Sequence, residues 1–250
     1  MGVTVRVRFS LQQFAKVFTV HNLDGLPYVL VGGQAVNYWA ERYLPIEPQL
    51  QKMLPFTSED IDFKGGREDV KRIAGQLGLT PHYPHKVEMT ALAGFIQFQI
   101  GDLNSSIEVV RKIPGVSGPV ETLAIEAEWA GRKIRVLDPV SLFASKLELV
   151  ASVSREKRRD VEHLKILVPC VRAFLREFLE RMERGELPVK GWLGAANRVM
   201  KLTSMARGRK AAKQLGINWR EILPLDHIVA SENEKVVQFR EKRLPRWKTI

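Results

Sequence analysis

The 250-residue sequence has almost no cysteine, no long apolar run and no repeated or low-complexity segment. Its one cysteine, Cys170, cannot form a disulfide within the chain, so the composition favours a reducing, cytoplasmic setting. No run approaches the roughly 18 apolar residues that span a membrane, and residues 1–8 lack the apolar region of a secretory signal. These absences argue against a membrane protein and indicate a globular chain, whose hydrophobic content of 45% is that of an ordinary core.

An excess of either charge is missing from the first 150 residues. They hold 16 Lys and Arg against 16 Asp and Glu, whereas residues 151–250 hold 23 against 12, which accounts for the whole net charge of +11. A neutral part joined to a basic part is typical of an enzyme core with a polyanion-binding extension. A solvated, lysine-rich helical surface explains the same numbers, and both interpretations stay open.

Hydrophobic patterning predicts an α/β (α+β) fold, with a small mixed sheet flanked by helices, followed by an all-α part. The strands are expected at Tyr28–Val31, Asp60–Phe63, Phe95–Ile100 and Ile107–Val110, with another pair around Gly131. The first helices are expected at Leu11–Val20 and Gln34–Tyr43, and from Gly65-Gly66 to Leu77. Between the second helix and Asp60, the proline-punctuated stretch Leu44–Phe56 is expected to be irregular.

Asp138-Pro139 is a sharp boundary, because Asp is a good helix N-cap and Pro suits the first helical position. Almost everything that follows has helical spacing. We therefore expect a core domain over residues 1–137 and a basic helical domain over 138–250, in which 231–250 forms a flexible tail. Trp192, Trp219 and Trp247 lie among basic residues and suit either base stacking or packing, with packing favoured for the first two.

Two carboxylates flank an isoleucine in Ser58-Glu59-Asp60-Ile61-Asp62-Phe63. Successive side chains of a strand alternate between faces, so Asp60 and Asp62 are expected to point together, away from the core. Like charges held that close repel each other unless a cation lies between them, and Mg²⁺ takes such oxygen ligands. Glu108 stands between Ile107 and Val109 on a later strand and is a candidate third carboxylate.

A paired glycine follows the strand Tyr28–Val31. Gly32-Gly33 lets backbone amides approach a phosphate closely, and the N-terminus of the following helix favours that anion. Three acidic groups on neighbouring strands beside such a turn suit metal-dependent phosphoryl transfer. The sequence thus predicts Asp60, Asp62 and Glu108 as catalytic and metal-binding residues, with Mg²⁺ or Mn²⁺ as the cofactor.

Together these motifs resemble the minimal nucleotidyltransferases of the DNA polymerase β superfamily, and among them the bacterial abortive-infection, type IV toxin-like proteins. The likeness rests on the order strand, Gly-Gly, helix, Asp-x-Asp and third acidic strand. It continues through Leu137–Leu147, where such proteins carry a helix lysine, and through the Lys157–Leu164 segment with its Arg-Asp pair. It covers about residues 26–168.

The resemblance implies roles for further residues. Gly32, Gly33 and Ser58 would contact a nucleoside triphosphate, and Lys146 would reach a phosphate. Arg159 and Asp160 would brace the site. The sequence departs from the family in two ways: 26 residues separate Gly33 from Asp60, so Leu44–Phe56 looks like an insertion, and the third carboxylate is Glu108 rather than the commoner Asp.

The activity implied is transfer of a nucleoside monophosphate from an NTP to an acceptor hydroxyl, with release of pyrophosphate. The basic C-terminal part favours RNA as acceptor and partner, with a tRNA end as the sharpest expectation. A toxin with a cognate antitoxin, or a phage-defence factor, is the implied cellular role. The alternatives are a small-molecule or protein acceptor, and a non-catalytic nucleotide- or RNA-binding module.

Overall fold

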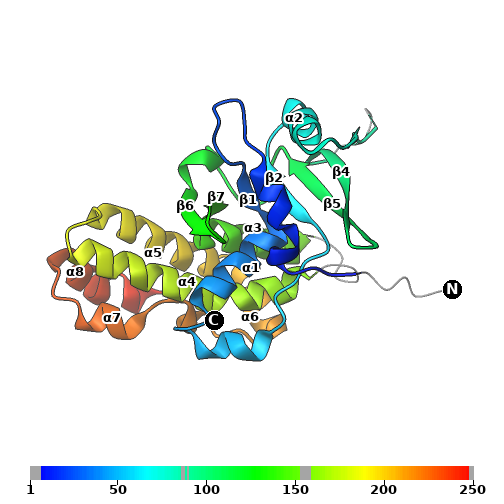
Figure 1. Cartoon of the computed structure of the whole chain (residues 1–250). Helices are drawn as coiled ribbons and strands as arrows, with labels where there is room; N and C mark the ends of the chain where they lie inside the picture. The colour runs from blue at the N-terminus through cyan, green and yellow to red at the C-terminus, as the bar shows by residue number, and fades with distance from the viewer. Residues whose placement is uncertain (1–6, 86–87, 89, 153–158, 248–250) are drawn as a thin grey trace. The chain divides into compact units, whose positions relative to one another are not determined.

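The computed structural model describes residues 7–85, 88, 90–152 and 159–247 (Figure 1). The chain forms two compact units. Unit 1 comprises Met1–Glu41 and Leu54–Leu142, and unit 2 comprises Arg42–Met53 and Phe143–Ile250. The expected fold class is confirmed, since a mixed sheet is followed along the chain by a helical part.

Unit 1 contains the sheet. Its strands are β1 (Val29–Val31), β2 (Ile61–Lys64), β3 (Pro81–His82), β4 (Leu92–Ile100), β5 (Leu103–Val110), β6 (Ala124–Trp129) and β7 (Arg132–Leu137). The seven strands lie in the order β3-β4-β5-β2-β1-β7-β6. In the centre, β2 is parallel to β5 and antiparallel to β1, and β1 is parallel to β7. Segments far apart in the sequence therefore lie side by side, as Figure 1 shows for β1, β2 and β5.

Short helices belong to the same unit. They are η1 (Leu11–Thr19), α2 (Arg67–Leu77), η3 (Val120–Thr122) and most of α1 (Gly32–Tyr43). The ring of Phe18 in η1 meets Phe63 of β2 edge-on, with 6.1 Å between centroids, so η1 covers the face of β2 to which Phe63 points. As predicted, α2 ends at Leu77, and Gly78 after it adopts the left-handed conformation at φ +67°.

Unit 2 is helical. Its elements are η2 (Pro48–Met53), α3 (Pro139–Ser152) from Phe143 on, α4 (Asp160–Glu183), α5 (Val189–Ser204), α6 (Ala206–Leu215), η5 (Trp219–Ile222), α7 (Leu225–Ala230), α8 (Glu234–Lys242) and η6 (Leu244–Arg246). No helix in the described ranges is both long and apolar enough to cross a membrane. The predicted boundary after residue 137 is close to the change of unit at Leu142, and unit 2 also takes up Arg42–Met53.

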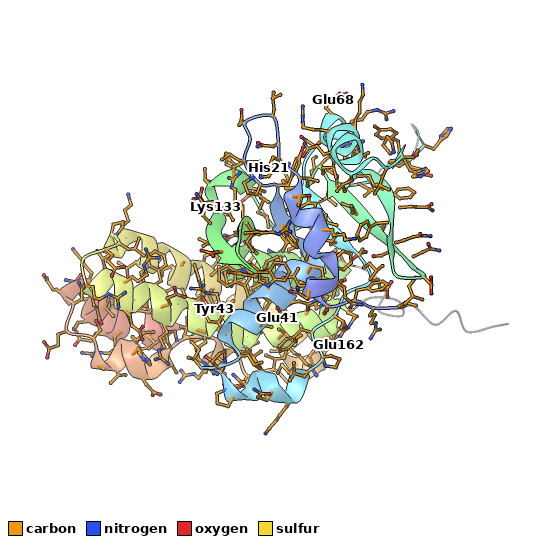
Figure 2. The ribbon with its side chains drawn as sticks, in the orientation of Figure 1. His21, Glu41, Tyr43, Glu68, Lys133 and Glu162 are labelled. Atoms are coloured by element: carbon orange, nitrogen blue, oxygen red, sulfur yellow. The ribbon has the colours of Figure 1, made fainter. Side chains whose placement is uncertain are left out.

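The expected insertion is held by an ion pair within unit 2. Its segment 48–53 forms η2, in which Leu50 is fully buried. Just before η2, Glu47 accepts hydrogen bonds from the guanidinium of Arg172 on α4, one of them 3.0 Å long at Nε. In Figure 2, Tyr43 marks the start of this segment, and its hydroxyl donates to Glu177 at 3.0 Å. These contacts attach both ends of the turn from Tyr43 to Glu47 to α4.

Three tryptophans that are candidates for base stacking are instead part of the core. Trp192, Trp219 and Trp247 are only 0%, 1% and 5% exposed. Each indole N–H donates a buried hydrogen bond, to the carbonyls of Leu175 and Gly208 and to the hydroxyl of Thr203. Packing, the role favoured for Trp192 and Trp219, is therefore confirmed, and base stacking is wrong for all three rings, because their faces and polar edges are used in packing.

Part of the stretch predicted as a flexible tail is also folded. Within residues 231–247, α8 buries Val236 and Phe239, and the ring of Phe239 lies edge-on to Trp192 with centroids 5.4 Å apart. Residues 248–250 lie outside the described part of the chain. Charged residues at both ends of α8, Glu234-Lys235 and Arg240-Glu241-Lys242, leave too short an apolar pattern for periodicity to identify the helix.

Candidate active site

The central pair of carboxylates comes from two adjacent strands of unit 1. In the parallel pairing of β2 with β5, Asp62 lies opposite Glu108, Ile61 opposite Ile107 and Phe63 opposite Val109. The four apolar side chains are at most 1% exposed, so they fix which face is buried. Asp62 and Glu108 consequently share the opposite face as direct neighbours, the arrangement that alternation predicts.

Asp60 precedes β2 in a bend, rather than opening the strand as predicted. Its carboxylate Oδ1 accepts a hydrogen bond of 3.4 Å from the hydroxyl of Ser58. Ser58 is itself fixed by two backbone hydrogen bonds with Phe9, of 2.8 and 2.9 Å. On the other side, the Ser105 hydroxyl donates to the carbonyl of Glu59 at 2.8 Å, which ties this bend to β5. The bend is thus anchored to its neighbours on both sides.

Gly32 brings the start of α1 directly onto Asp62. Val31, the last residue of β1, is in register with Asp62, and Gly32 then turns the chain at φ +66°. A Cβ placed on Gly32 would lie 1.8 Å from Oδ2 of Asp62, so only a residue without a side chain fits. Gly33 follows as the second residue of α1. The structure therefore brings the Gly-Gly turn and the second aspartate into contact.

Replacing Gly32 with alanine is expected to destabilise the fold by about 1–2 kcal/mol from the left-handed conformation alone, with a further cost for displacing Asp62. Chemical denaturation of Gly32→Ala measures this loss. Gly75→Ala in α2 is the matched control, because its Cβ would meet nothing within 4 Å. It is expected to gain about 0.5–1 kcal/mol from helix propensity. A Gly32→Ala protein as stable as the wild type would contradict the close approach to Asp62.

Two buried amides that the sequence did not single out hold the start of α1. Gln34 and Asn37 are both fully buried. The Gln34 amide donates to the carbonyl of Phe9 at 3.0 Å, and Asn37 donates to Gln34 at 3.0 Å. Since Phe9 also pairs with Ser58, this chain of bonds connects the start of α1 to the bend that carries Asp60. The sequence signal that could have identified Gln34 and Asn37 is their position as polar residues within an apolar helix pattern.

The other residues that the resemblance implied lie in unit 2. Lys146 on α3 and Asp160 on α4 form an ion pair of 2.8 Å, with side chains only 8% and 11% exposed. Arg159 pairs with Glu162, one turn further along the chain. The ammonium group expected to reach a phosphate thus has a carboxylate partner inside its own unit, and Asp160 is that partner.

The donor set of the three carboxylates has the chemistry that Mg²⁺ prefers, since all its ligand atoms are carboxylate oxygens. The Asp62 carboxylate itself occupies the position that a side chain on Gly32 would take. Within the described ranges, however, no group of three or more His, Cys, Asp or Glu is arranged so that it could hold a metal ion. The structure thus pairs Asp62 with Glu108 and keeps Asp60 on the adjoining bend, without assembling a three-ligand centre.

No protein-family model matches the sequence, and no curated protein matches it. Among solved structures, the fold is similar to an antigenic nucleotidyltransferase-like protein from Paracoccidioides brasiliensis, at 13% identity and a TM-score of 0.43 over 65% of this chain and 78% of that one. It is also similar to the antibiotic-resistance factor ANT(2'')-Ia, at 15% identity and a TM-score of 0.43 over 74% of this chain and 94% of that one. At that distance neither protein assigns a residue role or an activity to this chain.

Proposed function

We propose that the chain is a metal-dependent nucleotidyltransferase. The observation that carries the proposal is the pairing of Asp62 with Glu108 on one face of the sheet, with Gly32 turning directly against Asp62. A strand, a glycine turn and two neighbouring carboxylates bring an anion-binding backbone beside hard oxygen ligands. Both features recur in enzymes that transfer phosphoryl groups from nucleotides.

In the proposed reaction, an acceptor hydroxyl bonds to the α-phosphorus of an NTP. The bond between that phosphorus and the bridging oxygen to the β-phosphate breaks, and pyrophosphate leaves. Gly32 and Gly33 hold the triphosphate, and Ser58 contacts the nucleotide and orients Asp60. Glu108 takes the hydroxyl proton. Asp60 and Asp62 would hold a divalent metal, which would stabilise the negative charge that develops during transfer.

RNA is the proposed acceptor, and the end of a tRNA is the most specific acceptor that we propose. Helices α5 and α6 support it, because their sequences contain no Asp or Glu. Their basic residues are Lys190, Arg198, Lys201, Arg207, Arg209, Lys210 and Lys213. Arg207 among them is paired with Glu148. A basic surface binds a polyanion by releasing its counterions. A toxin controlled by an antitoxin, or a phage-defence factor, would follow from such an activity.

Neutralising part of this basic surface is expected to weaken RNA binding without affecting the chemistry. Lys201, Lys210 and Lys213 are all exposed, and their triple replacement by Gln removes three charges. We expect the slope of log K against log salt to fall by about 2, at about 0.7 per single-strand phosphate contact. Fluorescence anisotropy with labelled RNA at several salt concentrations measures this change.

The matched control replaces three exposed lysines of other segments, Lys52, Lys71 and Lys112, by Gln. An equal loss of slope in the control would show that only net charge matters. No loss in either triple variant would contradict RNA as the partner of α5 and α6, and would favour a small-molecule or protein acceptor.

A further inference from the structure

A cleft of about 310 Å³ opens in unit 1 at the edge of the sheet where β2 and β5 end and β1 begins. Its walls come from the loop before β1, from Gly65-Gly66 after β2, and from side chains of β7 and the segment after β5. The predicted site residues Gly32, Asp60, Asp62 and Glu108 do not line it. It is therefore a separate feature of the same sheet.

Strand register brings three cationic side chains to this cleft: Lys64, Arg111 and Arg135. Lys64 is the last residue of β2 and lies opposite Val110, so Arg111 directly follows its neighbour on β5. Arg135 on β7 lies opposite Val29, the first residue of β1. Three positive charges in such a space repel one another, and an anion between them relieves that repulsion.

The lining holds two acidic residues, Asp69 and Glu121, against the three cationic ones. Asp69 is already committed: its carboxylate accepts from the Gly66 amide at 2.8 Å, from the Tyr28 hydroxyl at 3.1 Å and from Arg72 at 2.9 Å. Glu121 meets Arg135 through its backbone carbonyl, at 3.3 Å. Across the described ranges, Lys64 and Arg111 form no ion pair.

The walls of the cleft are held in place before any ligand arrives. His21, labelled in Figure 2, opens the loop that leads to Tyr28. Its backbone N–H donates to the Gln76 side chain at 2.9 Å, and its carbonyl accepts from the Gln76 amide at 2.7 Å. Burial raises the pKa of the Tyr28 hydroxyl, which therefore stays protonated as the donor to Asp69. Loop and α2 are thus fixed to each other on either side of the cleft.

We propose that this cleft binds a phosphate group through Lys64, Arg111 and Arg135. Guanidinium groups match phosphate oxygens in two-point hydrogen bonds, and a lysine adds a point charge. The volume is at the lower end of small-ligand sites, which suits one phosphate with the sugar attached to it. Side chains rather than backbone amides would bind the phosphate, because the Gly66 amide at the start of α2 already donates to Asp69.

The cleft adjoins the candidate active site along β2. Lys64 follows Asp62 by two residues on the same face, a Cα separation of about 7 Å in a strand. The phosphate group can belong to a free nucleotide or to the backbone of an RNA acceptor, and both offer the same oxygens. Binding in the cleft does not depend on catalysis, so it can be tested apart from the proposed function.

The test compares binding of inorganic phosphate, AMP and a short single-stranded oligoribonucleotide by isothermal titration calorimetry. In the Lys64→Gln/Arg111→Gln variant, affinity for at least one probe is expected to fall about tenfold or more, because two charge-assisted bonds are lost. The matched control is Lys71→Gln/Arg132→Gln, which removes the same charges from exposed positions outside the cleft. Unchanged thermal unfolding without ligand establishes that both variants are folded.

A loss with AMP and phosphate identifies a free nucleotide as the source, and a loss with the oligoribonucleotide alone identifies an RNA phosphate. Both outcomes support the cleft. Equal affinities in the cleft variant and the control, for all three probes, would overturn it. Asp62→Asn separates this proposal from the proposed function, because it is expected to keep the cleft-dependent binding even though transfer is lost.

Discussion

Asp62→Asn is expected to lower the rate of nucleotidyl transfer by about 10²–10⁴, equivalent to about 3–5 kcal/mol of transition-state stabilisation. The substitution keeps the shape that packs against Gly32 and removes the charge beside Glu108. The proposed metal ligand is lost while the buried face of β2 is untouched. Single-turnover transfer from a labelled NTP measures the rate, and thermal unfolding shows whether the variant stays folded. Asp60→Ala is expected to lose as much.

The matched control is Asp102→Asn, which neutralises an exposed carboxylate in the β4–β5 turn. It is expected to transfer at the wild-type rate. If Asp62→Asn kept more than about a third of the activity, a loss below 1 kcal/mol, the carboxylate would not take part in the transition state. A cellular effect that survives in an inactive Asp62→Asn protein would favour the non-catalytic binding module.

Lys146→Met is expected to reduce the free energy of unfolding by about 3–5 kcal/mol, because it leaves the Asp160 carboxylate buried without its partner. The pair is 2.8 Å long, and the side chains of Lys146 and Asp160 are 8% and 11% exposed. Urea denaturation measures the loss. Lys165→Met, at an exposed position on α4, is the control and is expected to change stability by less than about 0.5 kcal/mol.

Removing both charges shows how much of that loss comes from the unpaired Asp160 carboxylate and how much from the missing ion pair. In Lys146→Met/Asp160→Leu no ion is left unpaired, so most of the stability is expected to return. A Lys146→Met protein within about 1 kcal/mol of the wild type would mean that the pair is no stronger than an exposed one. A pair that weak would leave Lys146 available for the phosphate contact that the resemblance implies.

The sheet face of the carboxylates was predictable because it depends on alternation within single strands. Ile61 and Phe63, like Ile107 and Val109, are buried on one side, which leaves Asp62 and Glu108 on the other. The glycine turn was predictable for a related reason, since a buried strand that ends in Gly-Gly needs an unusual backbone. Its contact with Asp62 follows only from the pairing of β1 with β2.

Features that depend on long-range register were not predictable. The Lys146–Asp160 pair joins two helices, and no spacing rule relates residues on different helices. The three cations of the cleft come from β2, β7 and the segment after β5, and only the order β5-β2-β1-β7 brings them together. Trp247 looked like part of a basic tail because its partner, the Thr203 hydroxyl, is on α5.

The most direct test of nucleotidyl transfer follows the α- and γ-phosphates of the NTP separately. The protein is incubated with Mg²⁺, RNA and NTPs labelled at either the α- or the γ-phosphate. The account predicts that α-label becomes attached to RNA and that γ-label appears in pyrophosphate, with both signals lost in Asp62→Asn. Attachment of γ-label, or α-label that reaches no RNA, protein or small-molecule acceptor, would contradict nucleotidyl transfer at Asp60, Asp62 and Glu108.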